Sequence, residues 1–262
     1  MAVLNLKFGF RFLFLLCLCV LMGCSTTYNP ATGRNELIFI STPEEVALGE
    51  NVHQQLSQQY KFSKDRTKED RVNRIGQRLA QVSDRQDFVY HFYLIEKDEL
   101  NAFTTPGGNI YFFSGLYDKL STDEEIAGVL SHEIGHTAAR HTVKKFQAAL
   151  GYNLVGSLVL NQLEPGAGQQ AVSLSSSLVM NIIFSSYGRQ DEFQADRLGV
   201  KYMHLAGYNP HGMLDTLEVL KKEDKGGGGP LLFRSHPYTK DRIEAVKKEI
   251  ASVDQQFLPK PQ

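Results

Sequence analysis

The segment His132-Glu133-Ile134-Gly135-His136 constrains this chain more than any other stretch. Two histidines four residues apart lie on one face of an α-helix, so their ring nitrogens can hold a single Zn²⁺. The glutamate beside the first histidine can then act on a water at that ion. The alternative is a histidine pair satisfied inside a core. Cores rarely select a glutamate between two histidines, so the pattern favours a zinc site.

The residues before and within this segment predict a helix. Ser121 and Glu124 fit a capping box, with Ser121 as the N-cap. Beyond the cap, apolar residues recur at spacings of three and four: Ile126, Val129, Leu130, Ile134 and Ala138. The two histidines are therefore expected on a helix with a buried face.

A third metal ligand cannot come from the residues just after this segment. The metzincin pattern requires a glycine and a histidine where this chain has Ala139 and Thr142. His141 would lie about 140° around the same helix from His136, on a different face.

A second acidic helix offers a better candidate. Glu192 and Asp196 are one helical turn apart, so they can supply a ligand and a carboxylate that supports a liganding histidine. The small Ala195 between them would allow close approach to the first helix. The alternative for such a pair is a solvated acidic surface, which the nearby zinc motif disfavours.

These motifs together resemble the zinc metallopeptidase family that includes HtpX, Oma and the CAAX prenyl protease, and within it the periplasmic lipoprotein branch of BepA-, LoiP- and YcaL-like proteins. The resemblance spans roughly residues 30–250 and rests on residues 122–136, 192–196, 29–34, 100–103 and 235–237. It implies a gluzincin peptidase with one Zn²⁺ per chain, held by His132, His136 and Glu192. It also implies that Glu133 is the general base, that Asp196 supports the site, and that His236 lies close to the metal.

The N-terminus predicts export and lipidation. Lys7 and Arg11 precede an apolar run at residues 12–22, which is shorter than the ~20 residues needed to span a bilayer. Leu21-Met22-Gly23-Cys24 resembles a bacterial lipobox. We therefore predict a signal peptide at residues 1–23, lipidation of Cys24, a lipid-anchored tether at residues 24–32 and a metallopeptidase domain at residues 33–262. An ordinary signal peptide or an anchor helix is the alternative.

Composition agrees with an envelope protein. Cys17 and Cys19 would leave with the signal peptide and Cys24 would carry lipid, so the mature chain would hold no disulfide. Because Ser25 and not aspartate follows Cys24, the expected location is the periplasmic face of the outer membrane; the inner membrane and the soluble periplasm remain alternatives. The mature chain carries slightly more acidic than basic residues and no basic stripe, which gives no reason to expect nucleic-acid binding.

The remaining pattern predicts a mainly α fold with a small β-sheet (α+β), built round the zinc-binding helix. Helices are expected at residues 43–60, 64–82, 210–220 and 237–250, and strands at residues 88–95 and 109–113. Residues 154–160 and 171–184 are apolar but too short to span a membrane, so buried helices are expected there. Residues 226–230 predict a flexible loop.

A substrate-binding strand is also expected. Peptidases of this type hold a peptide as an added strand on a sheet edge. Asn109 and Tyr111, with Asn101 and Ala102 nearby, form the candidate edge, and an ordinary core strand is the alternative. His236 could either cap the zinc or stabilise the reaction intermediate.

Two functions fit these patterns. The first is a membrane-tethered zinc endopeptidase acting on misfolded or unassembled envelope proteins. The second is a non-proteolytic chaperone or assembly lipoprotein with a structural or latent zinc site. The intact Glu133 favours the enzyme, because a purely structural zinc site needs no general base. The sequence does not define an oligomeric state.

Overall fold

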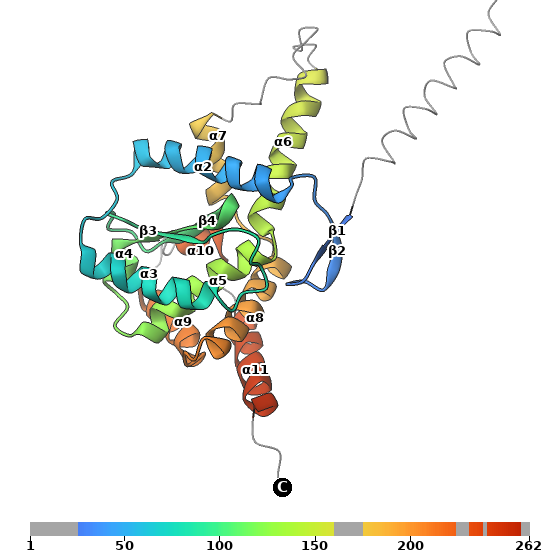
Figure 1. Ribbon diagram of the computed structural model, residues 1–262. Coiled ribbons are helices and arrows are strands. Elements are labelled where there is room, and N and C mark those ends of the chain that lie inside the picture. Colours follow the sequence, from blue (N-terminus) through green and yellow to red (C-terminus); the bar gives the residue numbers. More distant parts are fainter. Residues whose placement is uncertain (1–25, 160–174, 224–230, 238–239, 258–262) are drawn as a thin grey trace, which may run out of the picture.

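The structure, a computed structural model, describes residues 26–159, 175–223, 231–237 and 240–257 (Figure 1). The predicted signal peptide and the predicted lipidation site at Cys24 lie outside these residues, as do the whole predicted loop at residues 226–230 and part of the predicted helix at residues 171–184. The helices are α2 (Thr42–Gln59), α3 (Arg66–Ala80), α4 (Ser114–Tyr117), α5 (Asp123–Ala138), α6 (His141–Val159), α7 (Ser176–Phe184), α8 (Arg189–Leu205), α9 (His211–Glu223), α10 (Leu232–Ser235) and α11 (Lys240–Phe257). The strands are β1 (Thr26–Asn29), β2 (Arg34–Leu37), β3 (His91–Ile95), β4 (Ala102–Thr105) and β5 (Asn109–Phe113), with a 3₁₀ turn, η1 (Pro106–Gly108), before β5. The predicted α+β class with a small sheet is confirmed.

The three-stranded sheet is buried on both faces. Its order is β3-β5-β4, with β5 parallel to β3 and antiparallel to β4. Because side chains alternate along a strand, Ile110 and Phe112 enter the core with α3 and α5, whereas Tyr111 and Phe113 enter a second core with α2, α6 and α7. Figure 1 shows α2 on one side of the sheet and α3 and α5 on the other. This two-sided burial explains why β5 is almost continuously apolar.

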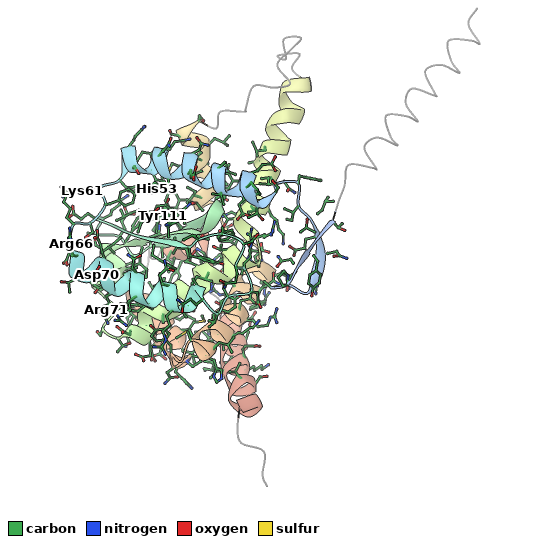
Figure 2. All side chains as sticks on the ribbon, in the orientation of Figure 1. His53, Lys61, Arg66, Asp70, Arg71 and Tyr111 are labelled. Carbon is green, nitrogen blue, oxygen red and sulfur yellow. The ribbon has the colours of Figure 1, made fainter. Side chains whose placement is uncertain are left out.

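The α2 side of the sheet is aromatic. His53 of α2 stacks on Tyr93 with ring centroids 4.4 Å apart, and its Nδ1 lies 3.0 Å from the hydroxyl of Tyr111 (Figure 2). Burial lowers the pKa of His53, and the nearby His91 lowers it further. His53 therefore acts as a neutral packing residue.

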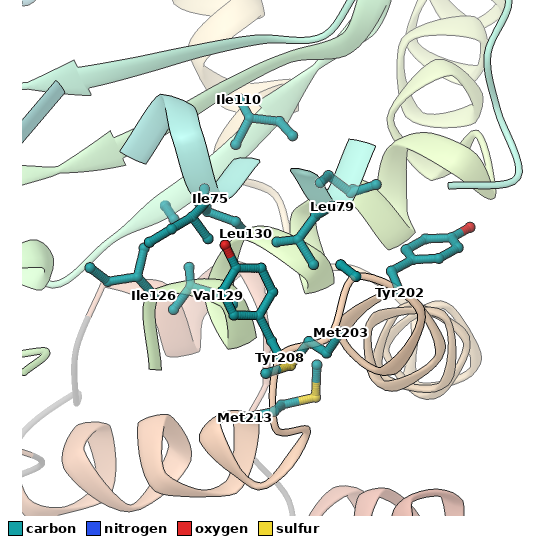
Figure 3. Close-up of a cluster of buried hydrophobic side chains, with 14 of the residues drawn as sticks. Ile75, Leu79, Ile110, Ile126, Val129, Leu130, Tyr202, Met203, Tyr208 and Met213 are labelled. Atoms are coloured by element: carbon teal, nitrogen blue, oxygen red, sulfur yellow. The ribbon is translucent and has the colours of Figure 1, made fainter. Parts of the chain in front are cut away.

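Helix α5 is the centre of the larger core. Every residue from Ile126 to Ala138 is buried, so the helix is covered on all sides and not only along an amphipathic stripe. Ile126, Val129 and Leu130 pack there with residues of α3, α8 and α9, as Figure 3 shows.

Two glycines allow neighbouring helices to approach α5 closely. A Cβ at Gly135 would lie 2.7 Å from the carbonyl oxygen of Ala195, and one at Gly128 would lie 2.8 Å from Cα of Met213. No side chain fits in either place. The first contact joins α5 to α8 at the metal-binding motif, and the small Ala195 is the partner that the sequence suggested.

The predicted cap of α5 is shifted by one residue. Thr122, and not Ser121, is the N-cap: its Oγ1 accepts a hydrogen bond from the amide of Glu125 at 3.1 Å. The Glu125 carboxylate in turn accepts from the amides of both Thr122 and Ser121. The sequence fits a cap at either Ser121 or Thr122. In the structure the Glu125 carboxylate accepts from two amides, whereas the capping box predicted with Glu124 would bind one.

The predicted tether differs from the structure after residue 25. Residues 26–29 form β1, which pairs antiparallel with β2. Glu36 of β2 accepts hydrogen bonds from Lys144 Nζ at 2.8 Å and from Asn29 Nδ2 at 2.9 Å. The part of the expected tether that the structure describes is therefore a hairpin bound to α6.

The predicted edge strand is wrong for Asn109 and Tyr111. Both belong to β5, which is the central strand, so their backbone groups already pair on both sides. The prediction failed because sequence order does not give strand order: β5 lies between two strands that both precede it. Ala102 instead begins β4, an edge strand of the sheet, and Asn101 directly precedes it.

The opposite edge, along β3, is closed. Along this edge the carbonyl oxygens already accept hydrogen bonds. The side chain of Gln77 donates to Tyr90 and that of Asn73 to Phe92, and the amide of Ser63 donates to Leu94. The other edge of the sheet is β4, whose four residues are all buried.

Helix α7 packs as a core element, whereas the side chains of the predicted apolar helix at residues 154–160 lie outside the described part of the chain. Val179, Ile182 and Ile183 of α7 are buried against the second core. Among the residues that the structure describes, no helix combines the length and apolar character that crossing a bilayer requires.

Candidate metal centre

Two of the four candidate ligands come from α5. His132 and His136 are buried, and their Nε2 atoms lie 3.1 Å apart. This proximity follows from their spacing of one helical turn. Glu133, between them in sequence, is also buried.

The third candidate ligand comes from α8. Oε1 of Glu192 lies 3.3 Å from Nε2 of His136, while its Oε2 lies 2.5 Å from Nη1 of Arg242. Burial acts to raise the pKa of Glu192, but the charges of His236 and Arg242 outweigh burial and hold that pKa well below its ordinary value. Glu192 is therefore a carboxylate with one oxygen for a metal and the other for Arg242.

The fourth candidate ligand is His236, which directly follows α10. Its Nδ1 lies 3.2 Å from Nε2 of His132 and 3.0 Å from Oε1 of Glu192, and its Nε2 lies 3.5 Å from Oε1 of Glu133. The ring therefore stands between the other ligand atoms and the glutamate.

These four residues fit Zn²⁺. One ligand atom from each of His132, His136, Glu192 and His236 can be chosen so that all lie within 4.8 Å of one another, and all four residues are buried. In a tetrahedral zinc site with bonds near 2.0–2.1 Å, neighbouring ligand atoms are about 3.4 Å apart, close to the separations given above. Burial holds the pKa of His136 well below its ordinary value, which keeps the ring neutral and able to ligate.

The hydrogen bonds behind His136 direct its lone pair toward the ligand cluster. Oε1 of Gln194 can only accept, so Nε2 of His141, 2.9 Å away, is the donor. Burial lowers the pKa of His141, so its ring is neutral and its Nδ1 is an acceptor. Nδ1 of His136, 2.9 Å from that atom, must then carry the proton, which leaves its Nε2 free for a metal.

His141 was thus misplaced by the sequence argument. Helix α5 ends at Ala138, and Arg140 takes a positive φ of 58° that turns the chain into α6. A rotation counted along one continuous helix does not apply across this turn. His141 is not one of the clustered ligands, but it contacts one of them from behind.

His132 has a different support. Its Nδ1 lies 2.9 Å from Oδ1 of Asp196, which also accepts a hydrogen bond from Arg242 at 2.7 Å. Burial acts to lower the pKa of His132, but the hydrogen bond and charge of Asp196 outweigh it, so that pKa is raised. Asp196 thus lies where the sequence argument expected a supporting carboxylate.

Two residues at this site were not predicted. Arg242 contacts both Glu192 and Asp196, and Tyr187 stacks on His136 with ring centroids 3.9 Å apart. The signal for Arg242 was its position in line with the buried Val246, Ile250 and Val253 of α11, where an arginine needs an anionic partner. Tyr187 lies between helices, and no local pattern marks it.

The carboxylate of Glu133 has no hydrogen-bond partner for either oxygen among the residues that the structure describes. A buried carboxylate without such a partner is costly unless it serves a chemical purpose. Its nearest cluster neighbour is His236. The remaining described histidines, at positions 53, 91, 204 and 211, lie outside the metal cluster.

This arrangement defines a gluzincin-type zinc metallopeptidase domain: two histidines and a glutamate on one buried helix, with a further glutamate from a second helix. Residues 66–250 match the model of peptidase family M48. The chain belongs to this family, and the resemblance predicted from its sequence is confirmed.

Relatives agree. The chain is 27% identical over 221 residues to the beta-barrel assembly-enhancing protease of Escherichia coli (strain K12), which covers 82% of this chain and 45% of that protein. It is 29% identical over 186 residues to metalloprotease LoiP of the same organism, covering 70% of each. It is 28% identical over 178 residues to mitochondrial metalloendopeptidase OMA1 of Schizosaccharomyces pombe, covering 68% of this chain and 51% of that protein. The chain thus spans about half the length of several of these relatives.

Proposed function

We propose that this chain is a zinc-dependent endopeptidase in which His132, His136 and Glu192 hold the metal. The observation that carries the proposal is the Glu133 carboxylate, buried beside these ligands without a hydrogen-bond partner of its own among the described residues. Zinc, when bound there, would make a water acidic and polarise the scissile carbonyl.

The side chains divide the remaining work. Glu133 takes the proton of the attacking water and returns it to the leaving amine, as a general base and then a general acid. Asp196 and His141 hold the two liganding imidazoles in the tautomers that present Nε2. Arg242 pairs with both carboxylates, and its positive charge favours the ionised form of Glu192 in a buried site.

The enzyme is latent in this conformation. Nδ1 of His236 stands where a fourth ligand would bind, and its Nε2 faces Glu133, so the ring occupies space that the attacking water needs. His236 is therefore a cap that must leave before turnover. The alternative, donation to the reaction intermediate, would require the ring to shift away from the other ligand atoms.

Substrate would bind along β4, and the residues that cover this edge must first move aside, because all four residues of β4 are buried in this conformation. The backbone carbonyl of Asn101 accepts a hydrogen bond from the amide of Phe113 in β5. Backbone groups of successive residues point to opposite sides of a strand, so those of Ala102 and Thr104 point away from β5. Thr104 also contacts Thr137 of α5 through their hydroxyls, 2.7 Å apart. A peptide paired with Ala102 and Thr104 would run beside the metal-binding helix, with affinity from backbone hydrogen bonds.

The substrates are unfolded or unassembled envelope proteins, which supply the extended segments that strand addition requires. Lipidation at Cys24 would hold the protein at the periplasmic face of the outer membrane. The relatives named as beta-barrel assembly-enhancing proteases support this setting. A non-proteolytic assembly role is the second candidate, because a closed sphere of four protein ligands is typical of structural zinc.

Cleavage of an unfolded protein by the purified chain separates these two functions. We expect degradation of casein that stops with a zinc chelator, and a loss of at least ~10²-fold in rate for Glu133→Gln. That variant should keep about one zinc per chain, since Glu133 is not a ligand. Full activity in Glu133→Gln would remove this residue from the mechanism, and casein binding without cleavage by wild type would favour the assembly role.

A further inference from the structure

A small apolar cavity of about 40 Å³ opens beside Glu133. Its polar rim includes His132, Glu133 and His236, and its walls carry the apolar side chains Val129, Met213, Leu217, Leu220, Leu232 and Phe233. The cavity thus joins the metal centre to a space between α5, α9 and α10.

Its position follows from the spacing on α5. Val129 and Glu133 are four residues apart, so the wall of the cavity and the carboxylate lie on one helix face, one turn from each other. Gly128 also lines the wall, and α9 packs so closely against it that a side chain would not fit there. Oγ1 of Thr216 lies 2.9 Å from the carbonyl oxygens of both Glu125 and Gly212, so its single proton is shared between groups of the protein.

The chemistry of Glu133 decides what the cavity receives. The carboxylate must reach the attacking water and then the leaving nitrogen, so the residue that supplies that nitrogen lies on the Glu133 side of the scissile bond. Its side chain is the part of a substrate placed to enter this cavity.

We propose that this cavity is the specificity pocket for the residue on the amine side of the cleaved bond, and that it selects valine, leucine, isoleucine or methionine. This inference rests on the proposed peptidase function. A volume of about 40 Å³ holds ~3 water-sized groups, which suits a branched aliphatic side chain and excludes tryptophan. Asp196 and Arg242 also border the cavity but pair with each other, and the remaining walls are apolar, so a charged substrate side chain would be buried at a cost.

The pocket would also link the choice of substrate side chain to the position of the capping residue His236. Leu232 and Phe233 belong to α10, whose C-cap is His236, so one short segment supplies both a pocket wall and the capping ring. A substrate side chain in the pocket therefore touches the same element that covers the metal.

Peptides that differ only at the amine-side residue test the pocket. For wild type we expect kcat/KM at least ~10-fold higher with leucine than with glycine or tryptophan. Leu217→Phe should fill the pocket and remove most of the leucine preference, and Leu217→Ala should admit phenylalanine. Leu214→Ala, on the same helix but outside the pocket wall, is the matched control and should keep the wild-type ratios.

Binding keeps this test independent of turnover. In a Glu133→Gln background, the dissociation constants measured by fluorescence anisotropy should rank the same peptides in the same order, and Leu217→Met should retain that order if Leu217→Ala does not fold. Equal affinity for the leucine and glycine peptides, or selectivity confined to the carbonyl-side residue, would overturn the pocket assignment. Failure of both wild type and the uncapped His236→Ala variant to cleave any peptide would overturn the proposed peptidase function, while the binding order would still decide the pocket.

Discussion

The ring of His236 occupies the space between three candidate ligand atoms and the carboxylate of Glu133. If it caps the metal, His236→Ala should raise casein cleavage, because the ring no longer excludes the attacking water. If it donates to the reaction intermediate, the same change should lower kcat by ~10²-fold. We expect the increase, since Nδ1 lies 3.0–3.2 Å from its neighbouring ligand atoms. Unchanged rates and unchanged zinc affinity would contradict both roles.

The contact of His141 with His136 leads to a prediction about zinc affinity. His141→Ala removes the acceptor that fixes the tautomer of His136, so zinc affinity should fall by ~10–100-fold in a chelator competition. Gln194→Ala should have a smaller effect in the same direction, because it acts one hydrogen bond further away. His91→Ala, at an exposed position outside the site, is the control. A loss of metal-free stability without a change in affinity would assign His141 a purely structural role.

Local spacing determines how much of the site the sequence could reveal. His132, Glu133 and His136 share one helix, and Glu192 and Asp196 share another, so their spacing alone predicts that they face the same way. Arg242 and Tyr187 reach the site only through tertiary packing, and a single sequence does not encode the chain path that brings them there.

Elements show the same division. The bounds of β5 match the predicted residues 109–113, because its aromatic and β-branched residues define a strand locally. Its place at the centre of the sheet could not be predicted. That place depends on parallel pairing with β3, although β4 lies between these two strands in the sequence. The boundary between α5 and α6 also depends on the left-handed backbone of Arg140. No glycine or proline stands there to indicate a turn in the sequence.

The β1–β2 hairpin gives a prediction about pH at the scale of an element. Burial acts to raise the pKa of Glu36, but hydrogen bonds from Lys144 and Asn29 outweigh burial, so the pKa is lowered from 4.5. A lowered pKa means that the ionised form stabilises the hairpin above about pH 4.5, and that this contribution is lost as the pH falls through the lowered value.

Glu36→Gln should therefore lower the Tm at pH 7 by roughly 1–3 °C, the amount expected for a partly exposed ion pair in a domain of this size. The difference in Tm between wild type and variant should close as the pH is lowered below about 4.5. Glu50→Gln, at an exposed position, controls for the loss of one negative charge. A difference that stays constant from pH 7 to pH 3 would show that the ion pair does not contribute.

At the scale of the molecule, the metal centre joins parts of the chain that are far apart in sequence. His132 and His136 come from α5, Glu192 from α8, and His236 from the segment after α10. Arg242 pairs with Glu192, Asp196 contacts Nδ1 of His132 and His141 contacts Nδ1 of His136, so these groups are held from behind while their ligand atoms face one another. Bound zinc should therefore stabilise the whole domain and not only its active site.

We expect chelation to lower the Tm of the intact chain. A ligand present at ~100 times its dissociation constant stabilises a fold by ~2.7 kcal/mol, which corresponds to roughly 5–10 °C for a domain of this size. Adding back zinc should restore the Tm, whereas magnesium should not, because two or three imidazoles are poor ligands for that ion. In Glu192→Ala the zinc-dependent part of the shift should shrink, and in His91→Ala it should persist. A Tm that is unaffected by complete removal of zinc, confirmed by elemental analysis, would mean that the ligand cluster is held by the protein alone.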